Sequence, residues 1–272
     1  MKRIIAILLL VAIALTLCCC GKNKETEPTK STAVKQAEKA IKEIGEVTLE
    51  SEKAIKDAEK YYNILTDAEK AQVSNRLDLA NAKEAFEALL AAEEENKKEQ
   101  AFNNAKLAFE KLNEAAQLCI AGMDDVYGAW HFGIYDADDY SSSYVAMYLS
   151  LETSFTTNEI TQACSDAGFS VSYLTYDFNY CLWAIEQAHI NRGTFDQLHT
   201  LLGDVQSILQ EMSEKYGDYA YYPKLKEYYA KVASYADFFE NTTGSFQQLA
   251  TTINDYENSI RTYQSDLNFI FA

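Results

Sequence analysis

The sequence predicts an all-α protein, in which a small three-helix module is followed by a larger antiparallel helical bundle. Apolar residues recur at steps of three and four along most of the chain, a spacing that places side chains on one face of an α-helix. The chain contains only two prolines and ten glycines, and most of the glycines fall where one apolar stripe ends and the next begins. Alternation of apolar and polar residues, typical of a half-buried strand, is limited to residues 169–173.

Residues 1–19 have the order of an export signal peptide. Lys2 and Arg3 precede an apolar run from Ile4 to Leu17. This run is shorter than the roughly 18 apolar residues expected of a membrane-spanning helix. We therefore expect the protein to be exported rather than held by a transmembrane anchor.

The apolar run ends in Leu17, Cys18, Cys19 and Cys20, and this segment resembles the lipobox of bacterial lipoproteins. The resemblance implies cleavage before Cys20, a palmitate-bearing diacylglycerol anchor on its sulfur, and a place on the extracytoplasmic face of the cell membrane. The two acyl chains of a diacylglycerol suffice for stable membrane anchoring. Alternatives are Cys18 or Cys19 as acceptor, an ordinary signal peptide, and an uncleaved anchor. Residues 20–33 are mostly polar and predict a disordered tether after the lipidated cysteine.

Residues 34–92 form the predicted small module. The first helical stripe ends at Gly45, Thr66 and Glu69 have the pattern of a capping box, and the last stripe runs from Leu79 to Leu89. The positions that carry a similarity to known modules are Ile41, Ile44, Gly45, Val47, Thr48, Leu49, Ser51, Ile55, Tyr62, Leu65, Thr66, Lys70, Val73, Asn75, Ala82, Phe86 and Leu89. They resemble the FIVAR-like three-helix modules of Gram-positive surface proteins. The resemblance implies a spacer or binding module without catalytic residues.

A charged stretch, residues 93–100, separates this module from the second domain, residues 101–272. It lacks glycine and proline, so we expect a solvated helical connector, with a loop as the alternative. A further helix is predicted from Phe102 to Cys119, ending or bending at residues 120–122.

The middle of the second domain is the least regular part of the sequence. Residues 123–143 contain two glycines beside aromatic residues, and a helix is predicted over 144–155. Asn158 is the expected N-cap of a helix that ends at Gly168. Residues 173–188 also fit a helical stripe, and we expect a helix there rather than a strand.

Three long amphipathic helices complete the second domain. The first lies between Gly193 and Gly217, and the second has Pro223 in its first turn. The third is opened by Gly244 and Ser245, and its apolar seam consists of Phe246, Leu249, Ile253, Tyr256, Ile260, Tyr263, Leu267 and Ile270. This pattern predicts antiparallel packing, with the final helix along the length of the larger domain.

The charge of the chain excludes some partners. Its net charge is −17, so its surface repels nucleic-acid phosphates, and we expect no nucleic-acid partner. The same charge disfavours direct adsorption to an anionic bilayer, which leaves the lipid as the membrane contact. Cys119, Cys164 and Cys181 lie among apolar neighbours and are expected to be buried thiols, with a Cys164–Cys181 disulfide as the alternative.

Sequence motifs typical of catalysis are missing. The chain has no glycine-rich phosphate loop, no HExxH, no CxxC and no GxSxG. We therefore expect no enzymatic activity, no cofactor and no metal site. Two weaker metal hypotheses are a zinc pair from His189 and His199, and calcium at Asp136, Asp138 and Asp139, for which a solvated turn that caps the next helix is preferred.

Tyrosine is over-represented, and 17 of the 19 tyrosines follow residue 120. Most fall on apolar stripes and are explained by core packing, but some cannot all face inward. The candidate ligand-binding residues are Trp130, His131, Tyr135, Tyr219, Tyr221 and Tyr222. The predicted function is noncatalytic binding of a glycan, a peptide or an envelope protein, and the alternative is a structural spacer or assembly subunit. A concave aromatic or polar pocket would favour the first, and a lateral apolar patch the second.

Overall fold

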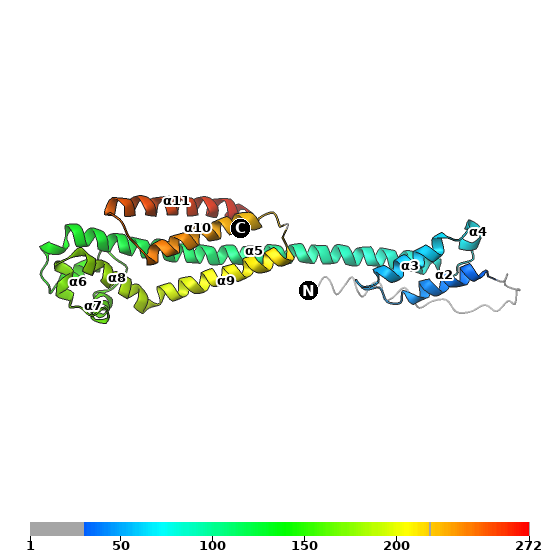
Figure 1. The fold of residues 1–272 in the computed structure, drawn as a ribbon, viewed down its shortest axis with the longest axis horizontal. Coiled ribbons are helices and arrows are strands. Elements are labelled where there is room, and N and C mark those ends of the chain that lie inside the picture. The colour runs from blue at the N-terminus through cyan, green and yellow to red at the C-terminus, as the bar shows by residue number, and fades with distance from the viewer. Residues whose placement is uncertain (1–29, 218, 272) are drawn as a thin grey trace. The chain divides into compact units, whose positions relative to one another are not determined.

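The computed structural model describes residues 30–217 and 219–271, and every regular element among them is a helix (Figure 1). No strand occurs in these two ranges, which confirms the predicted all-α class. Within residues 169–173, the alternating pattern leads into a 3₁₀ helix, η2 (Val171–Thr175), rather than a strand. The predicted signal peptide and Cys20 lie outside the described residues.

The chain divides into two units, the first ending at Glu93 and the second beginning at Glu94. Helix α5 (Arg76–Tyr135) contains this boundary, so the charged residues 93–100 are helical. Each unit has hydrophobic core residues of its own.

Local interactions set the helix ends of the first unit. The Ser31 hydroxyl accepts a hydrogen bond from the Val34 amide at 3.2 Å at the start of the first helix. Gly45, just after the end of the same helix, has a φ of +65°. Thr66 and Glu69 form the predicted capping box. The elements are α2 (Thr32–Glu43), α3 (Glu52–Asn63), α4 (Asp67–Lys70) and the start of α5.

The predicted tether, residues 20–33, extends too far toward the C-terminus. Residues 32 and 33 already belong to α2, because the Ser31 hydroxyl caps this helix and also donates a hydrogen bond to Glu69 at 2.8 Å. That second contact joins segments that are distant in the sequence, so periodicity alone did not predict it.

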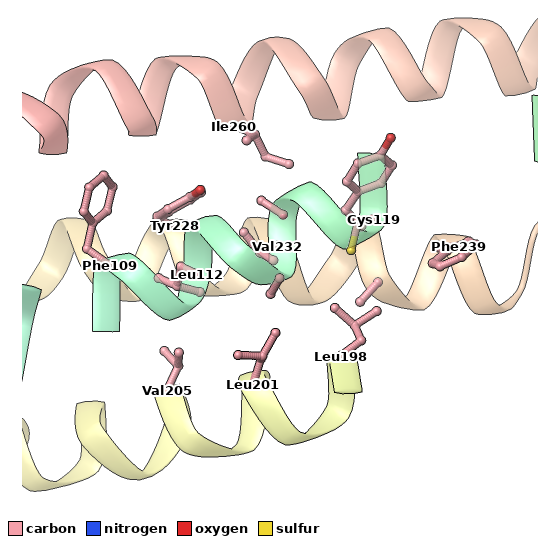
Figure 2. Packing of buried hydrophobic residues seen from close by; sticks show 14 of the residues in the cluster. Phe109, Leu112, Cys119, Leu198, Leu201, Val205, Tyr228, Val232, Phe239 and Ile260 are labelled. Atoms are coloured by element: carbon pink, nitrogen blue, oxygen red, sulfur yellow. The ribbon is translucent and has the colours of Figure 1, made fainter. Parts of the chain in front are cut away.

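Four long helices of the second unit share one core. They are the part of α5 beyond Glu93, α9 (Thr194–Lys215), α10 (Tyr222–Glu240) and α11 (Phe246–Phe271). Short connections join α9 to α10 and α10 to α11, and the helices run antiparallel (Figure 1). Figure 2 shows their interior, with Phe109, Leu112 and Cys119 of α5, Leu198, Leu201 and Val205 of α9, Tyr228, Val232 and Phe239 of α10, and Ile260 of α11.

A second core lies under shorter elements between α5 and α9. It includes Phe132 of α5 together with buried residues of the elements that follow. These elements are η1 (Ala137–Asp139), α6 (Val145–Leu149), α7 (Thr157–Asp166), η2 and α8 (Phe178–Arg192). They carry the candidate site described below.

The predicted stop of the helix at residues 120–122 is wrong, since α5 continues to Tyr135. Gly122 is a packing contact: a Cβ atom there would lie 2.1 Å from Cζ of Phe239. A Cβ on Gly128 would lie 2.0 Å from the carbonyl oxygen of Glu152. These glycines let neighbouring elements approach α5, so they do not end it.

Three further boundaries differ from expectation. The helix predicted over residues 173–188 begins only at Phe178, because the Asp177 side chain caps α8 and residues 171–175 form η2. The helix predicted over residues 144–155 is limited to the five residues of α6. The N-cap of α7 is Thr156 rather than Asn158, because Thr156 and Glu159 form a second capping box. The later boundaries at Gly193, Pro223 and Ser245 are confirmed.

The three cysteines of the described chain are buried free thiols. Cys164 and Cys181 therefore do not form the disulfide kept as an alternative. Burial raises the pKa of each of the three thiols to about 12, so these side chains act as small apolar residues.

Candidate functional site

An open hollow lies where α7, η2 and α8 meet. Gly168 has a φ of +85° and reverses the chain after α7, with the Phe169 amide donating to the Cys164 carbonyl at 3.0 Å. Ser170 then caps η2, and the Asp177 side chain accepts from the Asn179 amide at 2.9 Å to start α8. Short-range interactions thus place three helical segments around one concave surface.

The lining of this hollow contains no Asp, Glu, Lys, Arg or His. The hollow is wide open to solvent and has a volume of about 700 Å³. It combines three aromatic rings with three aliphatic hydroxyl groups, and its lining residues are Thr161, Ser165, Gly168, Phe169, Ser170, Val171, Tyr173 and Tyr180. We call it the aromatic hollow.

Aromatic rings continue from the hollow along α8. The ring of Tyr180 lies 5.0 Å from those of Phe169 and Tyr173, and 5.1 Å from that of Trp183. Tyr173 also contacts Tyr176 at 5.8 Å. Tyr176 is 74 % exposed and Trp183 is 49 % exposed, whereas Phe169 and Tyr180 are half-buried against the second core. Large aromatic side chains exposed together are typical of a binding surface.

Two carboxylates near the hollow already accept hydrogen bonds. Asp166 accepts from Gln162 and Asn191, each at 2.8 Å, and Asp177 accepts from the amide and side chain of Asn179. These groups make the surroundings acidic without adding a charged group to the lining.

A buried polar cluster beside α8 was not predicted. Asp125 is 4 % exposed and accepts from the Ser154 amide at 2.5 Å and from its hydroxyl at 2.7 Å. Arg192 donates to the Ser154 hydroxyl at 2.9 Å and to Glu159 at 2.9 Å. The Nε2 atom of His189 lies 3.4 Å from Asp125.

This cluster is not arranged as a nucleophile with its base. The Ser154 hydroxyl bonds Asp125 and Arg192, and its contacts do not include His189. Burial, followed by the charge of Arg192, lowers the pKa of His189 to about 4, so the ring is neutral at pH 7. Burial likewise raises the pKa of Asp125. These hydrogen bonds hold residues 154–159 against α5 and α8.

Hydrogen bonds explain the lowered pKa values of two carboxylates, Glu159 and Glu38. Glu159 accepts from the Thr156 amide and hydroxyl and from Arg192, which lowers its pKa to about 2. Glu38 of the first unit pairs with Lys30 at 2.5 Å and accepts from Ser74, which lowers its pKa to about 2 as well. Glu159 stabilises the start of α7, and Glu38 joins α2 to Lys30 and to Ser74.

The first three predicted site residues lie at the C-terminal end of α5. Trp130 is buried, with its ring 6.0 Å from that of Phe178. His131 is half-buried and Tyr135 is exposed, and both contact Phe246 at the start of α11, with ring centroids 6.1 Å apart. Trp130 therefore belongs to the core, whereas the other two belong to the surface.

The other three predicted residues lie near the opposite end of α11. Tyr219 contacts Tyr221, and Tyr221 contacts Phe271, the last residue of α11. Tyr222, half-buried, begins α10. Phe246 and Phe271 are about 37 Å apart along the helix axis. The structure therefore does not bring the two predicted groups together into one patch.

The aromatic hollow was missed because its residues were assigned to a core stripe. Cys181, Ala184 and Ala188 are the buried positions of α8, while Tyr180 and Trp183 point to other faces of the same helix. The sequence feature that could have revealed the hollow is the number of aromatic residues between 169 and 183, which is more than one helix face can bury.

A second open hollow, of about 520 Å³, lies between α10 and α11 and includes Asp237. Its aromatic residues already pack on each other, since Tyr256 stacks on Tyr235 at 4.7 Å and on Phe238 at 5.8 Å. The ring pairs of the aromatic hollow are edge-on or tilted, whereas these two pairs are stacked.

The metal hypotheses gain no geometric support. His189 faces Asp125, whereas His199 pairs with Glu240 at 2.7 Å. Asp138 and Asp139 lie in η1, and Asp136 precedes it. Tyr144 caps α6 without a side-chain hydrogen bond, so these aspartates do not cap that helix. Among residues 30–217 and 219–271, no group of three or more His, Cys, Asp or Glu side chains is placed to hold a metal ion.

Comparison with known proteins gave no matching family model, curated protein or solved structure. In the described ranges, no helix has both the length and the apolar character needed to cross a membrane.

Proposed function

We propose that this protein is a cell-envelope lipoprotein, held by a lipid on Cys20 at the extracytoplasmic face of the membrane, and that it acts as a noncatalytic binding protein. The N-terminal sequence supports the location, because a cationic start, a short apolar run and a lipobox-like segment follow one another. The FIVAR-like resemblance of residues 34–92 supports the same location, since such modules recur in Gram-positive surface proteins.

The aromatic hollow is the observation that supports binding most strongly. It is concave, it combines aromatic rings with hydroxyl groups, and an exposed row of rings extends it. Ligand sites of proteins share this mixture of apolar surface and a few polar groups. A binding role fits the hollow better than catalysis. Its only reactive groups are hydroxyl groups, and the lining has no acid or base that could activate them.

A second candidate function is that of an assembly subunit. Tyr127, His131 and Tyr135 lie at successive turns of α5, and all three contact Phe246. Tyr127 and Tyr135 are exposed, and His131 is half-buried. An exposed aromatic strip of this kind suits a lateral protein contact.

One pull-down separates the two functions. The full chain, Tyr173→Ala and Tyr135→Ala would each be used as bait with envelope extract and with a glycan array. The proposed function predicts that Tyr173→Ala loses the bound species and that Tyr135→Ala keeps it. The opposite result supports assembly through α5, and a chain that retains no species in either format contradicts both.

A further inference from the structure

We propose that the aromatic hollow binds an uncharged oligosaccharide, an inference that rests on the proposed binding function. The first reason is charge. The chain has a net charge of −17, and Asp166 and Asp177 lie beside the hollow, so an anionic ligand would be repelled. The lining itself carries no charged side chain, and an uncharged ligand can enter it without the cost of desolvating an ion.

The second reason is the pairing of rings with hydroxyl groups. A pyranose ring has faces of C–H groups and a rim of hydroxyl groups, so it needs flat apolar contacts and neutral hydrogen-bonding partners together. Tyr173 and Tyr180 supply aromatic surface, and Thr161, Ser165 and Ser170 supply hydroxyl groups. The Thr161 hydroxyl donates to the Thr157 carbonyl and is left to accept, whereas the Ser170 hydroxyl accepts from Ser172 and is left to donate.

The arrangement places these two kinds of group on different segments. Thr161 and Ser165 are four residues apart on α7, so they lie on the same face of that helix. Tyr173 comes from η2 and Tyr180 from α8, with their rings 5.0 Å apart. A sugar in the hollow would therefore have hydroxyl groups on the α7 side and aromatic surface on the other.

The exposed rings favour a chain of sugars over a single one. Tyr176 and Trp183 lie outside the hollow but contact Tyr173 and Tyr180 respectively. Their exposed surface offers contacts to units that extend beyond the hollow.

A peptide fits these features less well. Extended peptides commonly add a strand to a sheet edge, and the described ranges contain no strand. A cationic peptide would find no carboxylate in the lining itself, because Asp166 and Asp177 lie outside it.

Tryptophan fluorescence can test the proposal on the full chain. The protein has two tryptophans, and only Trp183 is both exposed and in contact with Tyr180. The chain would be titrated with neutral β-linked and α-linked glucose tetramers and an array of neutral glycans, and in parallel with tetragalacturonate and tetralysine. We expect a neutral glycan to change the Trp183 emission, and a Trp183→Phe variant to lose that signal.

Matched variants locate the bound sugar. Tyr173→Ala should weaken the neutral glycan about tenfold, since it removes an aromatic contact, and Ser165→Ala should weaken it about threefold. Tyr135→Ala removes an exposed tyrosine elsewhere in the same unit and should leave the affinity unchanged. Far-ultraviolet circular dichroism and thermal melting would verify that each variant is folded.

Three results would overturn the inference. The first is that no neutral glycan binds, and the second is that tetragalacturonate or tetralysine binds more tightly than every neutral glycan. The third is that neutral-glycan binding is unaffected by both Tyr173→Ala and Ser165→Ala. If Tyr173→Ala abolishes capture of a peptide or protein while no neutral glycan binds, the binding function stands and only the ligand class is wrong.

Discussion

At the residue scale, glycine has different roles at helix ends and inside helices of this protein. Gly45 and Gly193 have positive φ angles at helix ends, whereas Gly122 and Gly128 lie inside α5 where other elements touch its backbone. Gly203 lies inside α9 with no atom within 4 Å of the position a Cβ would take. The consequence of adding a methyl group therefore depends on the tertiary neighbours rather than on helix propensity alone.

Replacing Gly128 and Gly203 by alanine should have effects of opposite sign. Gly128→Ala should lower the free energy of unfolding by about 1–3 kcal/mol, because its Cβ would collide with the Glu152 carbonyl and the helix would have to shift. Gly203→Ala should raise it by about 1 kcal/mol, because alanine is the better helix former and meets no neighbour. Urea unfolding measures both, and equal effects of the two substitutions would contradict the close approach at Gly128.

The buried imidazole of His189 should make stability depend on pH. Its pKa is about 4 in the folded chain, while a free histidine titrates near pH 6.5. Between these values the unfolded chain binds a proton that the folded chain does not, so the free energy of unfolding falls as the pH is lowered. The loss from this residue should be about 2 kcal/mol between pH 6.5 and pH 5.

A His189→Gln variant tests this assignment by urea unfolding at several pH values. It should remove most of that loss, and an unchanged slope would show that the imidazole titrates normally. The carboxylates of Glu38 and Glu159, with pKa values of about 2, lose their stabilising contribution only below pH 4.5 and so do not disturb the window. Asp125, whose pKa is raised by burial, is present in both proteins.

At the element scale, α11 is stabilised along one face only. Leu249, Ile253, Ile260 and Leu267 are buried on α5 and α10, whereas Phe269 is 94 % exposed. Ser245 and Gln248 exchange hydrogen bonds at the start of this helix. The helix therefore depends on a seam of apolar contacts together with a local cap.

Two truncations on α11 should separate these faces. Ile260→Ala should lower the free energy of unfolding by about 2–5 kcal/mol, because it leaves a cavity between α11, α10 and α5. Phe269→Ala removes a larger side chain from solvent and should change stability by less than about 0.5 kcal/mol. Denaturant unfolding checks both, and a large loss at Phe269 would indicate a contact with a second copy or another partner.

At the scale of the whole molecule, the proposed lipid decides where the protein resides. The acidic chain has no strong attraction to an anionic membrane of its own, so attachment should depend on one sulfur atom. Cys20→Ser should move the protein from the membrane fraction to the soluble fraction. Fractionation with immunoblotting detects the shift, and mass spectrometry of the native N-terminus identifies the acyl group.

Variants at the neighbouring cysteines serve as controls for this prediction. Cys18→Ser and Cys19→Ser should keep the protein on the membrane if Cys20 is the acceptor. Membrane attachment that survives Cys20→Ser but is lost in Cys18→Ser would identify Cys18 as the lipid acceptor. An intact Met1 without any acyl group would contradict the lipoprotein proposal.

Much of the fold was predictable, because helix formation and helix ends are local. The capping box at Thr66, the turn at Gly193 and the first-turn Pro223 all depend on residues within about one helical turn. The candidate site was less predictable. Residues 173–188 were predicted as one helical stripe, but Tyr173 belongs to η2 and Tyr180 to α8, and their exposure depends on how these two elements meet the second core.

The sequence by itself determined the helical class, most helix boundaries and the acidic charge, and it indicated an exported lipoprotein, because these follow from composition and from neighbours along the chain. Only the tertiary structure decided that Gly122 and Gly128 are contacts, that Trp130 is buried, and that the two predicted aromatic groups lie at opposite ends of α11. The physical reason is that packing joins residues far apart in sequence, and helical periodicity does not specify which element covers which face.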